Sequence, residues 1–275
     1  MRTIIVHYHI FKNAGCSVDR ILEMSFGDRW TTFEGATATS LLRPHDLSLF
    51  VKDRPEVLAI SSHLLRPPAP ADLDVLPVVL VRHPLDRAFS VYSQLRRNNG
   101  VLVSETVARE SGFSDFVLWC LNHKPLGGVV IADYQVIHLS RASFRSEHIY
   151  NAVAVEDDLR DVIDYLAGVA CFGTVDCLET TMARLRRVAE GINLHLSTAE
   201  VAENRTIGRP DDLVERLSIA QRQLGPALYD RYMQENELDW RLYEWASCHQ
   251  ADARLNVSRD GGGQLEESAS YTGLF

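Results

Sequence analysis

The chain has 275 residues, of which 46% are hydrophobic and 24% are charged, and its net charge is −9. This length and apolar content favour a single domain with a full core, over 1–250, followed by a flexible polar tail over 251–275. The acidic balance argues against nucleic acid as a partner, because such proteins need a broad basic face. No apolar run of about 18 residues and no signal-peptide pattern is present, so we expect a cytoplasmic protein without a membrane span.

The charge is unevenly distributed along the chain. Residues 1–100 hold 12 Lys and Arg against 10 Asp and Glu, whereas 101–275 hold 16 against 27. A basic cluster confined to the first part of the chain fits one small anionic ligand better than a polyanion. The five cysteines are odd in number and form no CxxC pair, which predicts free thiols and no zinc site.

Apolar periodicity and turn residues predict an alternation of strands and helices. The predicted strands are 3–9, 29–33, 58–62, 76–81, 152–155 and 172–175. The predicted helices are 17–24, 36–49, 84–98, 114–121, 133–139, 157–166, 178–191, 211–224 and 227–247. This order is typical of an α/β fold with three layers, in which helices flank a central, mainly parallel sheet.

Three residues that suit chemistry follow predicted strands. His9, His63 and Arg82 each lie at the carboxyl end of a strand. Ligands of parallel sheets collect outside these strand ends. We therefore expect the three side chains to meet at one crevice.

The first strand leads into a loop with the composition of an anion site. Lys12 is followed by a turn of small residues, and a helix is predicted from Ser17. The backbone amides of 14–17 would then point at one anion, since a helix N-terminus favours negative charge. Lys12 precedes the loop glycine, Gly15, so the pattern is not the Walker A loop.

Two stretches together resemble one enzyme family. Residues 9–17, HIFKNAGCS, resemble the HIPKTGGTS-type 5′-phosphosulfate loop of sulfotransferases that use 3′-phosphoadenosine 5′-phosphosulfate (PAPS), with departures at Phe11, Asn13, Ala14 and Cys16. Residues 80–92, LVRHPLDRAFSVY, resemble the RxPxxRxxSxY signature that binds the 3′-phosphate of PAPS in this family. The resemblance implies a P-loop-like fold, PAPS as cofactor, 3′,5′-ADP as product and no metal.

The resemblance also implies roles for individual residues. It assigns the 5′ end of the nucleotide to Lys12, Asn13, Ala14, Gly15, Cys16 and Ser17, and the 3′-phosphate to Arg82 and Ser90. Lys12 would also neutralise the leaving phosphate as the bond to sulfur breaks. The alternatives are a solvated loop lysine at Lys12, a helix cap at Ser17, and a surface arginine and serine at Arg82 and Ser90.

His63 is the expected general base. The segment 61–64, SSHL, is similar to the xGHx segment whose histidine has this role in the family, with Ser in place of Gly. A neutral imidazole accepts a hydroxyl proton near neutral pH. His7, His9 and Glu34 stay open as bases, and His63 as a structural histidine. Arg87 is left open as well, because it could pair with Asp86 or Asp115.

Later stretches are similar to the family too, and the rival functions differ in class. These stretches are 133–139, 172–175 and 239–243, and Asn204, Arg205 and Arg209 could close over the nucleotide. The expected acceptor is a hydroxyl of a carbohydrate or other small molecule. The rivals are a silent nucleotide-binding scaffold protein and a P-loop kinase-like enzyme, the latter disfavoured because no GK[ST] sequence is present.

Overall fold

The centre of the protein is a parallel sheet. The computed structural model describes residues 2–37, 40–146, 149–198 and 210–257. Its five strands are ordered β2-β3-β1-β4-β5, and all neighbouring pairs are parallel. The strands are β1 (Thr3–Tyr8), β2 (Trp30–Thr32), β3 (Ala59–Ser62), β4 (Asp74–Val81) and β5 (Cys171–Thr174). The predicted α/β class and parallel sheet are confirmed.

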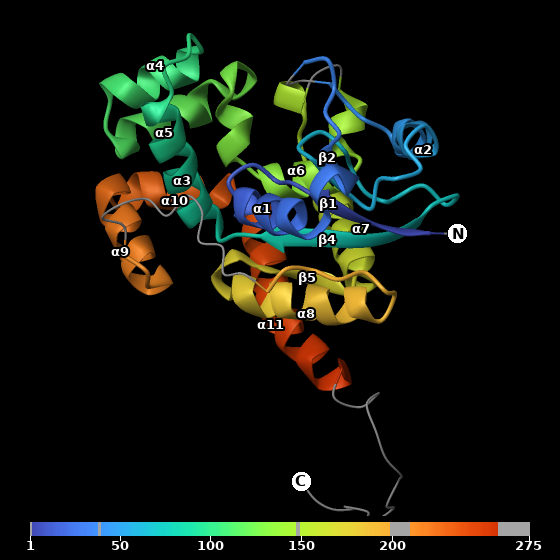
Figure 1. The fold of residues 1–275 in the computed structure, drawn as a ribbon. Coiled ribbons are helices and arrows are strands. Elements are labelled where there is room, and N and C mark those ends of the chain that lie inside the picture. The colour runs from blue at the N-terminus through green and yellow to red at the C-terminus, as the bar shows by residue number, and fades with distance from the viewer. Residues whose placement is uncertain (1, 38–39, 147–148, 199–209, 258–275) are drawn as a thin grey trace, which may run out of the picture.

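Helices lie on both sides of the sheet (Figure 1). They are α1 (Gly15–Phe26), α2 (Pro44–Lys52), α3 (Pro84–Arg97), α4 (Val103–Glu110), α5 (Phe113–Asn122), α6 (Tyr134–Leu139), α7 (Glu156–Ala167), α8 (Leu178–Glu190), α9 (Leu213–Leu224), α10 (Pro226–Gln234) and α11 (Glu237–Val257). Short 3-10 helices are η1 (Gly27–Arg29), η2 (Lys124–Leu126), η3 (Gly128–Ile131), η4 (Ala142–Arg145), η5 (Ile149–Asn151) and η6 (Val175–Cys177). No helix in these described ranges is long and apolar enough to cross a membrane.

Alternating side chains of β1 build two separate cores. Val6 packs in one core with α2, α6, α7 and α11, whereas Ile5 packs in the other with α1 and α8. Both are fully buried, because β1 is covered on both faces, as the continuous apolar run predicts. A third core joins α3, α4, α5, α9 and α10 beyond the end of the sheet. The result is the expected three-layer arrangement, extended by a helical cluster.

The structure corrects several predicted elements. The strand predicted at 152–155 is wrong: the segment has no ladder partner and leads into α7, with Val153 69% exposed. The helix predicted over 36–49 is α2, which begins only at Pro44. The closing helix predicted over 227–247 is two helices, α10 and α11, with a turn between them. In this turn Asn236 accepts from the Asp133 amide and donates to the Tyr232 carbonyl.

The cysteines and the C-terminal end complete the description. All five cysteines are free thiols, as their number and spacing predict. Helix α11 continues to Val257, beyond the domain boundary predicted at 250. The rest of the predicted tail, 258–275, and the residues Asn204, Arg205 and Arg209 lie outside the described residues.

Candidate active site

The loop between β1 and α1 presents consecutive backbone N–H groups. Lys12 and Ala14 adopt left-handed backbone conformations, with φ of 69° and 59°. The amides of Ala14, Gly15 and Cys16 have no hydrogen-bond acceptor within the described part of the chain. Such unpaired amides at a helix N-terminus suit an anion. The Ser17 amide, predicted as a fourth donor, instead donates to the Ala14 carbonyl at 3.0 Å.

Gly15 is required by the close approach of His9. A Cβ atom at position 15 would lie 2.0 Å from Nε2 of His9, far inside van der Waals contact. His9 itself is buried, with 5% exposure. The only glycine of the loop is therefore explained by packing of the imidazole against the start of α1.

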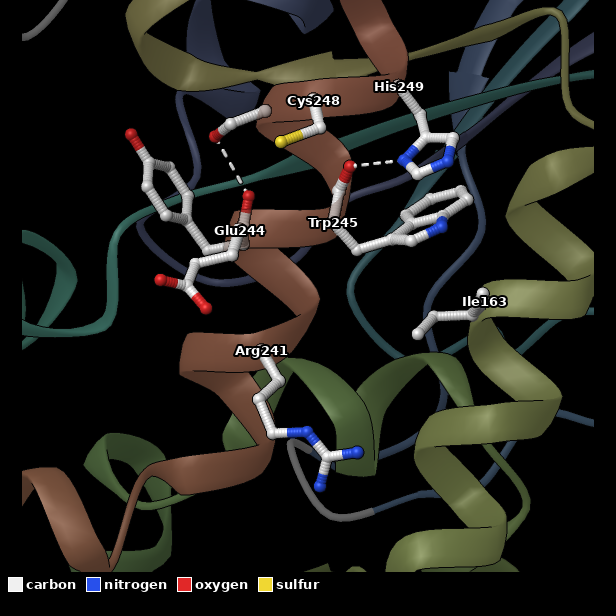
Figure 2. A pocket seen from close by; sticks show the side chains of 8 residues that line it. Ile163, Arg241, Glu244, Trp245, Cys248 and His249 are labelled. Carbon is white, nitrogen blue, oxygen red and sulfur yellow. Dashed lines mark hydrogen bonds between the residues drawn. The ribbon is translucent and has the colours of Figure 1, made fainter. Parts of the chain in front are cut away.

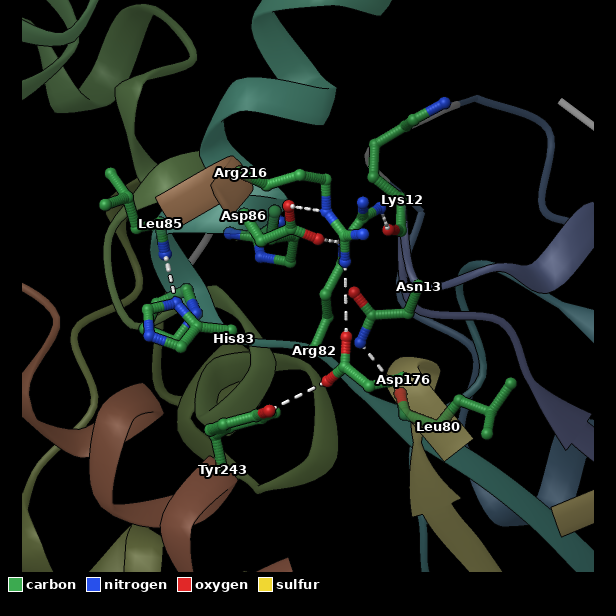
Figure 3. A network of polar contacts seen from close by, with 12 residues as sticks. Lys12, Asn13, Leu80, Arg82, His83, Leu85, Asp86, Asp176, Arg216 and Tyr243 are labelled. Carbon is green, nitrogen blue, oxygen red and sulfur yellow. Dashed lines mark hydrogen bonds and ion pairs between the residues drawn. The ribbon is translucent and has the colours of Figure 1, made fainter. Parts of the chain in front are cut away.

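Asn13 fixes the loop to the sheet. Its Nδ2 donates to the Leu80 carbonyl at 2.7 Å (Figure 3). The same Nδ2 donates to Oε1 of Gln135 at 2.7 Å. Its backbone N–H donates to the Ile10 carbonyl at 3.1 Å. Both nitrogens of Asn13 thus donate within the protein, and a contribution of Asn13 to nucleotide binding stays a prediction.

Gln135 carries this attachment on to Arg82. Its Oε1 also accepts from the Arg82 amide at 2.8 Å, and its Nε2 donates to the Arg82 carbonyl at 2.9 Å. Asp239 in α11 accepts in turn from the Gln135 amide at 3.1 Å. The stretches around 133–139 and 239–243 thus act as supports of the strand ends.

The two stretches of the sequence resemblance touch each other. Nη1 of Arg82 donates to the Lys12 carbonyl at 2.7 Å, and Nε of Arg82 lies 2.6 Å from Oδ2 of Asp86 (Figure 3). The other oxygen of Asp86 lies 2.9 Å from Nε of Arg216 in α9. Two arginines thus share one buried carboxylate. Ser90, with 7% exposure, lies two turns along α3 from Arg82.

Arg87 is a structural residue. It pairs with neither Asp86 nor Asp115, the partners that the sequence left open; it donates instead to the Val130 and Phe11 carbonyls. Its guanidinium lies 4.9 Å from the centre of the Tyr134 ring. Burial lowers the pKa of Arg87, which is fully enclosed.

His63 and Glu34 form one unit. Nδ1 of His63 and the His63 amide both lie 2.9 Å from Oε1 of Glu34. A carboxylate only accepts, so Nδ1 carries the proton and the lone pair of the neutral ring is at Nε2. The His63 side chain is 45% exposed. Glu34, a rival base in the sequence, therefore orients His63.

The His63 ring belongs to a stack of three imidazoles, with His9 in the middle and His7 at the other end. The ring centre of His9 lies 3.8 Å from that of His63 and 5.0 Å from that of His7. Asp19 in α1 faces two of these rings: Oδ1 lies 2.9 Å from Nδ1 of His7, and Oδ2 lies 2.9 Å from Nδ1 of His9. Sequence reasoning missed Asp19, because nothing in the pattern of α1 separates it from a solvated helix residue.

The stack has a defined charge. Burial lowers the pKa of His9 to about 4, although hydrogen bonding to Asp19 opposes the shift. Burial alone would raise the pKa of Asp19, but its hydrogen bonds to His7 and His9 outweigh this and hold it below its usual range. At neutral pH Asp19 is charged and His9 is neutral.

His7, His9 and Asp19 together form a set of side chains that could hold a metal ion. Donor atoms of His7, His9 and Asp19 lie within 4.8 Å of one another. Nδ1 of His7 is hydrogen-bonded to Asp19, and Nδ1 of His9 lies 2.9 Å from the other carboxylate oxygen, so contacts within the protein account for the arrangement.

We expect two buried histidines to make the protein less stable in mild acid. Burial lowers the pKa of His9 and of His83, the N-cap of α3, to about 4. Below about pH 6.5 the unfolded chain binds protons that the folded chain does not, so stability falls toward pH 4. Each histidine should cost about 2 kcal/mol at pH 5 relative to pH 7.

Urea denaturation at pH 7 and pH 5 measures this loss. His83→Asn keeps a capping side chain and should remove the share of His83. His45→Asn, on the exposed surface of α2, is the control and should leave the pH dependence unchanged. An equal loss in wild type and His83→Asn would contradict a neutral, buried His83.

A groove runs along α11. It is lined by Ile163, Arg241, Tyr243, Glu244, Trp245, Ser247, Cys248 and His249 (Figure 2). The hydroxyl of Tyr243 donates to Asp176 at 2.8 Å, and Asp176 pairs with Arg216. None of the sequence-predicted site residues lines the groove. The candidate site is instead the group of side chains at the ends of β1, β3 and β4.

Comparisons with known proteins identify no family. No family model matches the chain. The chain is 25% identical over 249 residues to an uncharacterized protein of Archaeoglobus fulgidus, and the match covers 88% of this chain and 95% of that protein. The match indicates a relative of nearly the same length.

Proposed function

We propose that this protein is a PAPS-dependent sulfotransferase that transfers the sulfuryl group to a hydroxyl of an acceptor. The observation that carries the proposal is the hydrogen bond between Arg82 and the Lys12 carbonyl, 2.7 Å long. It joins the two stretches that resemble the 5′ and 3′ phosphate sites of one nucleotide, although they are 70 residues apart. A single ligand with two phosphate groups fits such a pair of sites.

The residues present fit the 5′ end of this nucleotide. The unpaired amides of 14–16 and the start of α1 would hold the 5′-phosphate. Lys12, half-buried beside them, would stabilise the charge that develops on the leaving phosphate. When bound, PAPS supplies the activated sulfuryl group and 3′,5′-ADP as the leaving group.

The 3′-phosphate would lie at the start of α3. Arg82 and Arg216 share the carboxylate of Asp86, and Asp176 also pairs with Arg216, so the two guanidinium groups are held together where they would bind the 3′-phosphate. The Ser90 hydroxyl would donate a further hydrogen bond. Because Arg82 also belongs to a buried ion pair, replacing it would disturb folding as well as binding.

His63 would accept the proton of the acceptor hydroxyl at Nε2. Glu34 holds the opposite ring nitrogen and fixes the orientation of the imidazole. The half-exposed His63 faces a side where an acceptor has access. A carbohydrate hydroxyl is the preferred acceptor, by resemblance to the carbohydrate-type family.

Thermal shift with two nucleotides tests the proposal. We expect 3′,5′-ADP to raise the melting temperature clearly more than 5′-AMP, which lacks the 3′-phosphate. Ser90→Ala should weaken 3′,5′-ADP binding by about 0.5–1.5 kcal/mol, the usual worth of one hydrogen bond, and leave 5′-AMP unchanged. Ser93→Ala on the same helix is the control. Equal shifts with both nucleotides in wild type would contradict the 3′ site.

A further inference from the structure

Arg66 is buried with part of its guanidinium unused. The side chain follows β3, is fully enclosed, and donates from Nη1 to the His63 carbonyl at 3.0 Å and to the Leu65 carbonyl at 3.2 Å. Its Nε and Nη2 atoms have no hydrogen-bond partner in the described ranges. Glu34, the carboxylate that acts on Arg66, is already bonded to His63. The Arg66 guanidinium is thus bonded to the backbone of the proposed base, and two of its nitrogen atoms have no partner in the described ranges.

His138 in α6 is a second buried polar side chain without a partner in the described ranges. It is fully buried, and neither ring nitrogen has a partner among the described residues. Its pKa lies well below the ordinary value, first because of burial and then because Arg66, His63 and His9 oppose a further positive charge. His138 is thus one of the buried groups on which the positive charge of Arg66 acts. As a neutral ring it offers one N–H donor.

An oxyanion is the group that satisfies this arrangement. A buried charge and buried donors without partners are costly, and each such group in a folded protein calls for a partner. The planar fork of arginine matches two oxygens of a carboxylate, sulfate or phosphate group. Nε and Nη2 of Arg66 and the ring nitrogens of His138 are buried without a partner in the described ranges, and Glu34 is occupied by His63.

We propose that Arg66 and His138 bind an oxyanion beside His63, at a site separate from the amides of the β1–α1 loop. Under the proposed function, on which this part rests, the oxyanion has two possible sources. It is either the sulfuryl group at the moment of transfer or an acidic substituent of the acceptor. Arg66 is bonded to the backbone of His63, so either source would lie near the residue proposed as the base.

Arg66→Met and His138→Leu test the site without any nucleotide. Replacing an unpaired buried charge by an apolar side chain of similar length is often neutral or stabilising, so Arg66→Met should fold. We expect sodium sulfate, at ionic strength matched with sodium chloride, to raise the melting temperature of wild type more than that of either variant. The general salting effect of sulfate is common to all proteins and cancels in this difference.

Arg184→Met is the matched control. Arg184 is also a buried arginine, but its terminal nitrogens donate to the Phe172 and Gln250 carbonyls, at 3.1 and 3.0 Å. Its replacement should lower stability and keep the full response to sulfate. If Arg66→Met fails to fold, His138→Leu carries the same comparison.

Calorimetry then separates the two sources of the oxyanion. If Arg66 binds the sulfuryl group, wild type should bind PAPS about ten- to a hundredfold more tightly than 3′,5′-ADP, and Arg66→Met should lose this difference. If Arg66 binds the acceptor, sulfate or acetate should bind to the wild-type complex with 3′,5′-ADP but not to that of Arg66→Met.

The outcomes keep this inference distinct from the proposed function. An Arg66-dependent response to sulfate in a protein that does not bind 3′,5′-ADP would support the anion site and contradict the nucleotide assignment. Normal 3′,5′-ADP binding, with sulfate, acetate and PAPS bound equally by wild type, Arg66→Met and His138→Leu, would overturn the anion site alone.

Discussion

Lys12→Ala should lower kcat by about 10²- to 10³-fold while changing the Kd of 3′,5′-ADP less than tenfold. The ammonium stabilises charge that appears only as the bond to sulfur breaks, so its loss acts mainly on the transition state. Nζ of Lys12 lies 3.2 Å from Oε1 of Gln94 and 5.9 Å from the centre of the Phe11 ring. These contacts orient the side chain.

Turnover, followed as release of 3′,5′-ADP in the presence of an acceptor, and calorimetric binding of 3′,5′-ADP measure the two effects. Lys52→Ala, at the exposed end of α2, removes the same charge far from the site and should change neither quantity. A variant Lys12→Ala that loses nucleotide affinity as steeply as kcat would show that Lys12 only binds the ground state.

His63→Ala should lower kcat by about 10²- to 10⁴-fold, the usual worth of a positioned base, with nearly normal affinity for 3′,5′-ADP. The ring lies on the acceptor side, in contact with Glu34 and His9. Glu34→Gln keeps a hydrogen-bond acceptor for Nδ1 but removes the carboxylate charge. We expect Glu34→Gln to lower kcat by about tenfold, because the oriented imidazole then lacks charge stabilisation.

The pH profile identifies the base independently. The wild-type rate should fall in mild acid, because protonation removes the lone pair of the histidine that accepts the proton. The pKa of His9 is lowered to about 4 by burial, so His9 is neutral throughout this range and cannot give the acidic limb. This fall of the rate in mild acid should be absent from the residual activity of His63→Ala. A limb that persists in this variant would assign the proton to another acceptor.

The parts of the fold that the sequence predicts are those where local pattern and burial agree. The apolar runs of β1 and β4 are buried on both faces, and Pro84 begins α3 as the sequence indicates. The error at 152–155 arises where they disagree: the segment is a short apolar run, but Val153 and Val155 are exposed and pair with no strand. Helix α4 was missed, since its stability comes from packing on α3 and α5.

In the candidate site, too, the sequence predicts some residues and misses their partners. The topology of parallel sheets predicts that His9, His63 and Arg82 gather at one edge of the sheet. His9 and His63 stack on each other, and Arg82 at the end of β4 bonds to the Lys12 carbonyl in the loop after β1. Their partners are remote in sequence: Arg216 reaches Asp86 across 130 residues, and Glu34 reaches His63 across 29. Pairs that form only when the chain has folded leave no periodic signal in the sequence.

Isothermal titration of the wild-type protein with 3′,5′-ADP, ATP and GTP tests the central claim most directly. If one nucleotide spans the β1–α1 loop and the start of α3, 3′,5′-ADP should bind at one site per chain, and more tightly than ATP or GTP by about tenfold or more. Binding of ATP or GTP as tight as that of 3′,5′-ADP, or no binding of 3′,5′-ADP at all, would contradict the account.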